Sequence, residues 1–235
     1  MRYQLSLQHV DAAYGPFRAL FDVTFGVEAG ATTALLGANG AGKSTVARAL
    51  SGLVPLTKGT IVLAGEDITN WSMWRRRRAG LLQIPEGRGV FSTLSVEENL
   101  KMGFVTHASR ERRRLLGEAY ERYPLFLERR RSRAGVLSGG QQRLLSLVPA
   151  LVAPPMVLLV DEPTLGLDPA ALSDVYEALA TLKQQGVTLV IIEQQIDRIL
   201  AFADHAIVLH HGQIEYQGSP DLARDALERG LTQSD

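Results

Sequence analysis

Short apolar runs bounded by turn-forming residues set the pattern of this chain. Three of them, at 34–36, 156–160 and 187–192, are almost free of polar residues, as is typical of strands buried on both faces of a parallel sheet. Helix-favouring segments follow the first two runs. The pattern therefore predicts an α/β fold with a mostly parallel sheet.

Residues 4–27 show a different pattern, in which apolar and polar positions alternate. The alternation predicts short antiparallel strands, with Leu5, Leu7 and His9 on one face of the first. A turn at 14–16 separates them from a second alternating stretch. We expect an N-terminal antiparallel β subdomain packed beside the parallel sheet.

The middle of the chain carries helix signals. Ser95 and Glu98 form a capping box that opens one helix, and the charged segment 109–131 predicts at least one more. The arginine run 75–78 is interpreted as a solvated helix face. Pro149 is expected to bend or end the helix in which it lies.

These elements are expected to form a single domain, residues 1–235, with an inserted α-helical subdomain. The nucleotide-binding core with its β subdomain takes in residues 4–84 and 136–220, the helical insert residues 87–135, and a short tail residues 221–235.

One glycine-rich segment between the first apolar run and the helix after it predicts a nucleotide site. Glycines let backbone N–H groups turn toward one anion, and the dipole of the following helix adds positive potential there. Lys43 is placed to reach the β- and γ-phosphates of a nucleoside triphosphate, and the Ser44 hydroxyl to hold a bridging Mg²⁺. The Lys-Ser pair disfavours an ordinary glycine-rich turn. The loop consists of Gly37, Ala38, Asn39, Gly40, Ala41, Gly42, Lys43, Ser44 and Thr45.

Two consecutive acids end the second apolar run. Asp161 and Glu162 would lie at the carboxyl end of a parallel strand, where ligands gather in such sheets. We expect Asp161 to be a magnesium ligand and Glu162 to polarise the attacking water. Tyr14 is a candidate to stack on a purine base, and a tyrosine that only fills a turn is an equal alternative.

Composition narrows the classes of function. The chain has no cysteine, which excludes disulfides and thiol-ligated metals, and its start lacks the apolar segment of a signal peptide. The uncharged stretch 144–160 is short for a membrane span and contains prolines, so we expect a soluble protein. Net charge is zero, but residues 75–133 carry fifteen basic residues against seven Glu, a basic insert in an acidic body.

Three motifs in order carry a resemblance to a known family: the phosphate loop, the pentapeptide Leu137-Ser-Gly-Gly-Gln141, and the strand ending in Asp161 and Glu162. Over residues 4–220 the chain resembles the ATP-binding subunits of ABC transporters. The resemblance implies a P-loop NTPase core and a Mg²⁺-dependent ATPase in which two subunits sandwich ATP head to tail.

The same resemblance implies roles for individual residues. Tyr14 would stack on the base, Glu162 would be the general base, and Asp168 would lie at the dimer interface. The signature segment would bind ATP held by the other subunit, and it consists of Ser138, Gly139, Gly140 and Gln141.

Two positions depart from the family pattern. Glu86 stands where most members have a glutamine, and we group it with Ser44 and Asp161 as a metal ligand; Gln83 is interpreted as a strand residue. Gln194 stands at the position of a catalytic histidine. Glutamine donates a hydrogen bond but stays neutral, so the sequence leaves open whether these departures weaken hydrolysis.

Three segments narrow the resemblance to the second ATP-binding subunit of branched-chain amino-acid importers: 85–88, 94–100 and 193–194. This implies uptake of branched-chain or related hydrophobic amino acids, powered by a cytoplasmic subunit peripheral to the inner face of the cell membrane. The implied partners are a second ATP-binding subunit or a second copy, two membrane permease subunits and, indirectly, a periplasmic binding protein. No nucleic-acid partner is expected.

Other functions stay open. The same machinery serves importers of urea or short amides and lipid exporters, and this subunit does not touch the cargo. A non-transport ABC ATPase acting on DNA or ribosomes is disfavoured, because such proteins typically carry long coiled coils or two cassettes. Neither the cargo, the ATP affinity nor the choice between homodimer and heterodimer is determined by the sequence.

Overall fold

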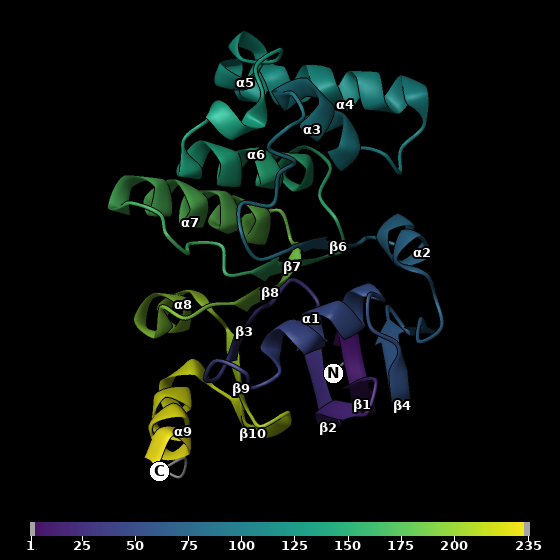
Figure 1. Cartoon of the computed structure of the whole chain (residues 1–235), viewed down its shortest axis with the longest axis vertical. Coiled ribbons are helices and arrows are strands. Elements are labelled where there is room, and N and C mark those ends of the chain that lie inside the picture. Colours follow the sequence, from purple (N-terminus) through teal and green to yellow (C-terminus); the bar gives the residue numbers. More distant parts are fainter. Residues whose placement is uncertain (1–2, 233–235) are drawn as a thin grey trace.

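A six-stranded, mostly parallel sheet forms the centre of the computed structural model, which describes residues 3–232 (Figure 1). The strand order is β10-β9-β3-β8-β7-β6, and the β9–β10 pair is antiparallel. The predicted α/β class is therefore confirmed. The strands are β3 (Thr32–Leu36), β6 (Leu81–Ile84), β7 (Val157–Asp161), β8 (Thr188–Ile192), β9 (His205–His210) and β10 (Gln213–Gly218).

A second, four-stranded antiparallel sheet packs beside the first, as predicted for the N-terminal segment. Its order is β2-β1-β4-β5, and its first two strands are long and continuous where the alternation predicted short ones. The strands are β1 (Tyr3–Tyr14), β2 (Phe17–Glu28), β4 (Leu56–Leu63) and β5 (Glu66–Asp67).

The placement of His9 on the same face as Leu5 and Leu7 is wrong. The register between β1 and β2 shifts between Leu7 and Val10, and His9 has a left-handed φ of 53°. Such a bulge reverses the phase of the strand, so the buried positions move to Val10 and Ala12. His9 is exposed, and its Nδ1 lies 2.9 Å from Asp22 Oδ1.

The central sheet sends alternate side chains into two hydrophobic cores. On β3, Leu35 packs toward the second sheet, whereas Ala34 and Leu36 pack against helices on the other face. α1 (Lys43–Ser51) lies between the two sheets and contributes Val46 and Leu50 to the first core. The helices of the second core are α6 (Gly139–Val152), α7 (Pro169–Gln184), α8 (Ile196–Phe202) and α9 (Pro220–Thr232).

The arginine run 75–78 is not simply a solvated face. It lies on α2 (Met73–Arg78), where Arg76 is buried. Its Nη1 donates to the carbonyls of Ala49 and Leu50, both at 2.6 Å, and its Nη2 to that of Thr69 at 2.8 Å. The C-terminus of α1 carries the negative end of the helix dipole and attracts a cation, which explains the burial of this guanidinium.

A lobe of helices lies at one end of the molecule (Figure 1). The capping box of Ser95 and Glu98 is confirmed at its first helix. A third hydrophobic core holds the lobe together, and it includes Leu145 and Val148 of α6. The helices of the lobe are α3 (Val96–Gly103), α4 (Ser109–Arg122), α5 (Pro124–Glu128) and the 3₁₀ turn η1 (Ala134–Val136).

Pro149 lies inside α6, which continues past it and ends at Val152. Pro149 removes the N–H that would bond the carbonyl of Leu145, yet the helix continues to Val152 and ends where Ala153 precedes Pro154. The predicted end therefore lies near Pro149 but follows from the next proline. The ring of Pro149 packs on Gly103: a Cβ at residue 103 would lie 2.2 Å from Pro149 Cγ. This contact joins α6 to α3. Among residues 3–232, no helix is both long and apolar enough to cross a membrane.

Candidate nucleotide-binding site

The phosphate loop connects β3 to α1 and has no room for side chains at two of its glycines. Gly37 has a φ of 144°, and a Cβ there would lie 2.3 Å from the carbonyl oxygen of Leu209. Gly42, with a φ of 105°, precedes the first residue of α1. The left-handed geometry turns the backbone so that α1 begins at the loop and directs its positive end there.

Lys43 is buried at the centre of this loop. Its Nζ donates to the carbonyl oxygens of Gly37 at 2.8 Å and Ala38 at 2.9 Å. Burial lowers the pKa of Lys43, and the charges of Glu162 and Asp161 act against that shift. The ammonium is therefore held by the loop's own carbonyls, at the point where phosphate oxygens would approach.

Asp161 ends β7 with its carboxylate buried beside the loop. Only 4% of the residue is exposed, and its Oδ1 has no hydrogen-bond partner. Burial and the charges of Glu162 and Glu86 raise its pKa to about 6, while a hydrogen bond with Ser44 acts in the opposite direction. An unpartnered carboxylate oxygen next to a hydroxyl is a donor set that suits Mg²⁺.

Glu162 has a left-handed backbone, with a φ of 46°, which costs a glutamate about 1–3 kcal/mol. Both of its main-chain groups are bonded: the N–H donates to the Ile192 carbonyl at 2.8 Å, and the carbonyl accepts from Arg143 Nη2 at 2.8 Å. The side-chain amide of Gln194 donates to Glu162 Oε1. The two residues predicted to be catalytic therefore touch one another.

A buried hydrogen bond between Thr164 and Glu193 lies next to the contact between Glu162 and Gln194. The Thr164 hydroxyl donates to Glu193 Oε2 at 2.6 Å, and Glu193 Oε1 accepts from the Gln194 N–H at 2.8 Å. Both side chains are buried. Glu193 thus ties the segment after β7 to the segment after β8, a role that the sequence did not indicate.

A cleft of about 860 Å³ brings together part of the phosphate loop and three predicted residues from other segments. Asp161 does not line the cleft, but its carboxylate forms a hydrogen bond with Ser44, which does. The predicted residues that line the cleft are Asn39, Gly40, Gly42, Lys43, Ser44, Thr45, Glu86, Glu162 and Gln194. Gln83 accepts a hydrogen bond from Ser51 inside the fold and is a strand residue, as expected.

Sequence reasoning missed the opposite wall of the cleft. This wall comes from β2 and from the turn between β9 and β10, and Leu165 joins it from the segment after β7. These segments are far apart in the chain, and a turn glycine was the one available signal. Gly212 has a φ of 76°, and a Cβ there would lie 2.4 Å from the carbonyl oxygen of Ala19. The missed residues are Arg18, Ala19, Phe21, Leu165, His211, Gly212 and Gln213.

Tyr14 does not line the cleft. It ends β1, is 41% exposed, and its hydroxyl accepts from Arg48 on α1 at 3.3 Å. Its hydroxyl therefore contacts a side chain of α1, and among the aromatic residues Phe21 lines the cleft instead.

The signature segment and Asp168 also lie outside the cleft, at two helix N-termini. Ser138 caps α6 in a capping box with Gln141. Gly140 faces α7, where a Cβ would lie 2.4 Å from that of Ala171, whereas Gly139 is more open. Asp168 caps α7 by accepting from the N–H groups of Ala170 and Ala171. The fold thus separates two groups of predicted site residues.

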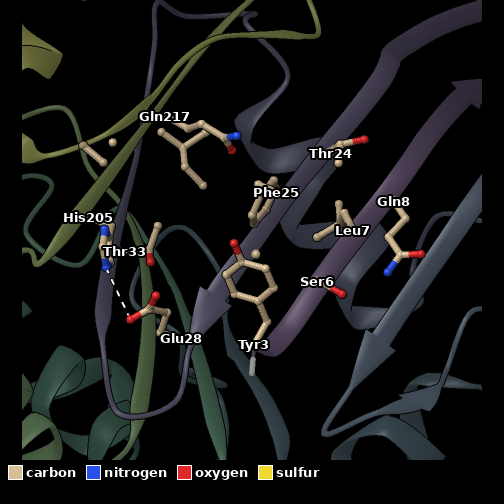
Figure 2. Close-up of a pocket in the computed structure, with 14 residues that line it drawn as sticks. Tyr3, Ser6, Leu7, Gln8, Thr24, Phe25, Glu28, Thr33, His205 and Gln217 are labelled. Carbon is tan, nitrogen blue, oxygen red and sulfur yellow. Dashed lines mark ion pairs between the residues drawn. The ribbon is translucent and has the colours of Figure 1, made fainter. Parts of the chain in front are cut away.

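A second cavity, of about 380 Å³, opens between the two sheets (Figure 2). Tyr3 directs its hydroxyl into it, and His205 Nε2 lies 3.8 Å from Glu28 Oε2 at its edge. Because Thr33 lines it, the cavity lies at the amino end of β3, and the phosphate loop follows the opposite end of that strand. None of the residues that line it was predicted to belong to the site.

Comparisons with known proteins agree with these motifs. The family model described as ABC transporter matches residues 20–165. The chain is 39% identical to the high-affinity branched-chain amino acid transport ATP-binding protein BraG of Pseudomonas aeruginosa, over 89% of this chain and 90% of that protein. It is 30% identical to the lipopolysaccharide export system ATP-binding protein LptB of Escherichia coli, over 92% and 90%.

A solved structure of an ATP-binding cassette of an ABC transporter, in its ADP conformation, is similar over 99% of both chains, with a TM-score of 0.84 and 25% identity. The expected family and activity are confirmed. This chain belongs to the ABC transporter family, as an ATP-binding subunit that hydrolyses ATP for transport.

Proposed function

We propose that this subunit uses Mg²⁺-dependent hydrolysis of ATP to power an importer of branched-chain or related hydrophobic amino acids. The observation that carries the hydrolytic part is the buried Glu162 carboxylate, held by Gln194 in the same cleft as Lys43. The cargo rests on similarity to BraG and to a probable branched-chain amino acid transport ATP-binding protein of Archaeoglobus fulgidus, 32% identical over 89% of both chains.

The phosphates of ATP would bind where the Lys43 ammonium now bonds to the loop. Lys43 would exchange the carbonyls of Gly37 and Ala38 for β- and γ-phosphate oxygens, and the N-terminus of α1 would add its dipole. Ser44 and Asp161, with Glu86 nearby, would hold a Mg²⁺, whose charge would offset that on the phosphates. Phe21, which lines the cleft, would face the base.

Glu162 would act as general base. Its carboxylate would take a proton from the water that attacks the γ-phosphorus, while the bond to the departing ADP oxygen breaks. The Gln194 amide would orient the carboxylate through its donated hydrogen bond and remain neutral throughout. In this arrangement the glutamine positions the base and does not itself exchange a proton.

A second subunit would complete the site. The signature segment offers a capped, electropositive helix N-terminus that lies outside this chain's own cleft. We propose that it binds ATP held by a second ATP-binding subunit, or by a second copy, and that Asp168 lies at that interface. Two permease subunits within the membrane, fed by a periplasmic binding protein, would complete the importer, with this subunit docked on their inner face.

The test is ATP hydrolysis by this subunit alone and reconstituted in vesicles with its partner ATPase and permeases. Activity should require the assembled complex and Mg²⁺, and Glu162→Gln should lower kcat by about 100-fold or more with ATP binding retained. Gln194→Ala should cost less than Glu162→Gln. Hydrolysis by the Glu162→Gln complex at the parent rate would exclude Glu162 as the base.

The cargo is tested separately, because relatives include an exporter subunit. Leucine with its binding protein should stimulate hydrolysis by the reconstituted complex. Stimulation by urea or a short amide instead would keep the ATPase assignment and overturn the amino-acid cargo.

A further inference from the structure

Arg143 is a buried cation that the mechanism above does not use. It lies on α6, and only 2% of it is exposed. Within the described part of the chain, no carboxylate lies within ion-pair distance of its guanidinium. Burial lowers the pKa of Arg143 to about 10, although the negative charges of Glu193, Asp161 and Glu162 act to raise it.

The guanidinium joins two main-chain carbonyls from different segments. Nη2 donates to Glu162 at 2.8 Å, and Nη1 lies 3.4 Å from the carbonyl oxygen of Pro85. Pro85 follows β6 and precedes Glu86, which lines the cleft. Because Ser138 caps the N-terminus of α6, the Arg143 side chain connects the signature helix, the segment that enters the helical lobe and the backbone of Glu162.

This contact bears on the reactive geometry of Glu162. The left-handed φ of Glu162 is unfavourable for a glutamate, and it persists only where surrounding contacts impose it. The Ile192 carbonyl holds the N–H of Glu162, and Arg143 holds its carbonyl. If the carbonyl were released, the backbone could relax, and the carboxylate would turn away from Gln194.

Stability alone does not explain a cation at this place. A buried charge without a carboxylate partner costs desolvation free energy, and an apolar side chain of similar volume often serves a core equally well. The planar fork of arginine can bond two carbonyls at once, which the single ammonium of a lysine does less well.

We propose that Arg143 is a positioning residue that holds the main chain of Glu162 in its reactive conformation and ties it to the segment at Pro85. The proposal rests on the proposed role of Glu162 as general base. It predicts that loss of the guanidinium slows the chemical step while ATP still binds.

The experiment compares Arg143→Met and Arg143→Lys with the exposed control Arg131→Met in the reconstituted complex. Arg143→Met should lower kcat by about 10- to 100-fold with little change in KM, Arg143→Lys should restore part of the loss, and the control should match the parent. In the Glu162→Gln background, Arg143→Met should add little further loss, because both changes act on one base.

A crystal structure of the Arg143→Met subunit provides a readout besides activity. Glu162 should leave the left-handed region and lose its bond to Gln194; if the variant does not fold, Arg143→Gln takes its place. An unchanged φ at Glu162, or an equal loss of kcat in the Glu162→Gln background, would overturn the proposal. A parent complex that binds ATP without hydrolysing it would refute the proposed function instead, and the φ at Glu162 would still decide the role of Arg143.

Discussion

The proposed role of Asp161 as a metal ligand would come at a cost to the stability of the fold. Its carboxylate is buried beside two other acids, and one oxygen has no partner. The folded state therefore binds the Asp161 proton more tightly than the unfolded state does. The free energy that this carboxyl contributes to folding is greatest below its ordinary pKa of 3.8 and is lost as pH rises through about 6.

Asp161→Asn should therefore stabilise the ligand-free subunit at pH 8 by about 1–2 kcal/mol, because the variant has no ionised carboxylate to bury. The gain should disappear near pH 4, where Asp161 is protonated. Urea unfolding at both pH values measures it, with the exposed Asp174→Asn on α7 as control. An equal gain at both pH values would show that ionisation is not its cause. The same variant should bind Mg²⁺-ATP more weakly.

The sequence predicted individual site residues correctly where the residues that share one chemical role are adjacent in the chain. The phosphate loop and the acids after β7 are each contiguous, and both follow parallel strands of one sheet, which brings Lys43, Ser44 and Glu162 to one cleft. His9 was assigned to the wrong face because a bulge with a left-handed residue changes which side chains of the strand face inward. The alternation of apolar and polar residues does not reveal such a bulge. Arg143 was missed because burial of an arginine depends on distant carbonyls.

At the scale of elements, α1 is anchored at both ends. Its N-terminus carries the phosphate loop, and the guanidinium of Arg76 bonds its last carbonyls. A rigid helix with its C-terminus fixed keeps the loop's N–H groups pointed at one place. The arginine run did not reveal this, because four identical residues conceal which one faces inward.

Arg76→Met should destabilise the subunit by about 2–4 kcal/mol, since the carbonyls of Ala49, Leu50 and Thr69 would lose a buried charged donor. Arg75→Met is the matched control. Arg75 is exposed and stacks on the Trp71 ring at 3.7 Å, so its loss should cost about 1 kcal/mol or less. Equal midpoints of urea unfolding for the two variants would contradict the anchoring role.

At the scale of the whole molecule, the fold places the signature segment outside the cleft that the phosphate loop lines. Glu162 and residues 39, 40 and 42–45 of the phosphate loop border the cleft, while the signature segment lies at the start of α6. Alternating and continuous apolar runs predicted both sheets. The distance between cleft and signature could not be derived from them, because it depends on how the helical lobe packs on α6.

Ser138→Arg should separate binding from assembly. The isolated variant should bind ATP as the parent does, because Ser138 does not line the cleft. In the Glu162→Gln background, the same change should abolish ATP-dependent dimers measured by light scattering. Weaker ATP binding by the isolated subunit would place the serine in its own nucleotide site and contradict the separation.

The contact of Gly103 with Pro149 limits how this sequence can evolve. Any side chain at 103 would overlap the proline ring, with a Cβ only 2.2 Å from Pro149 Cγ. A proline at 149 is therefore tolerated only in an ancestor that already carried glycine at 103. Once the pair is in place, mutation of the glycine is harmful until the proline reverts, so among descendants of this chain the two positions should change in a fixed order.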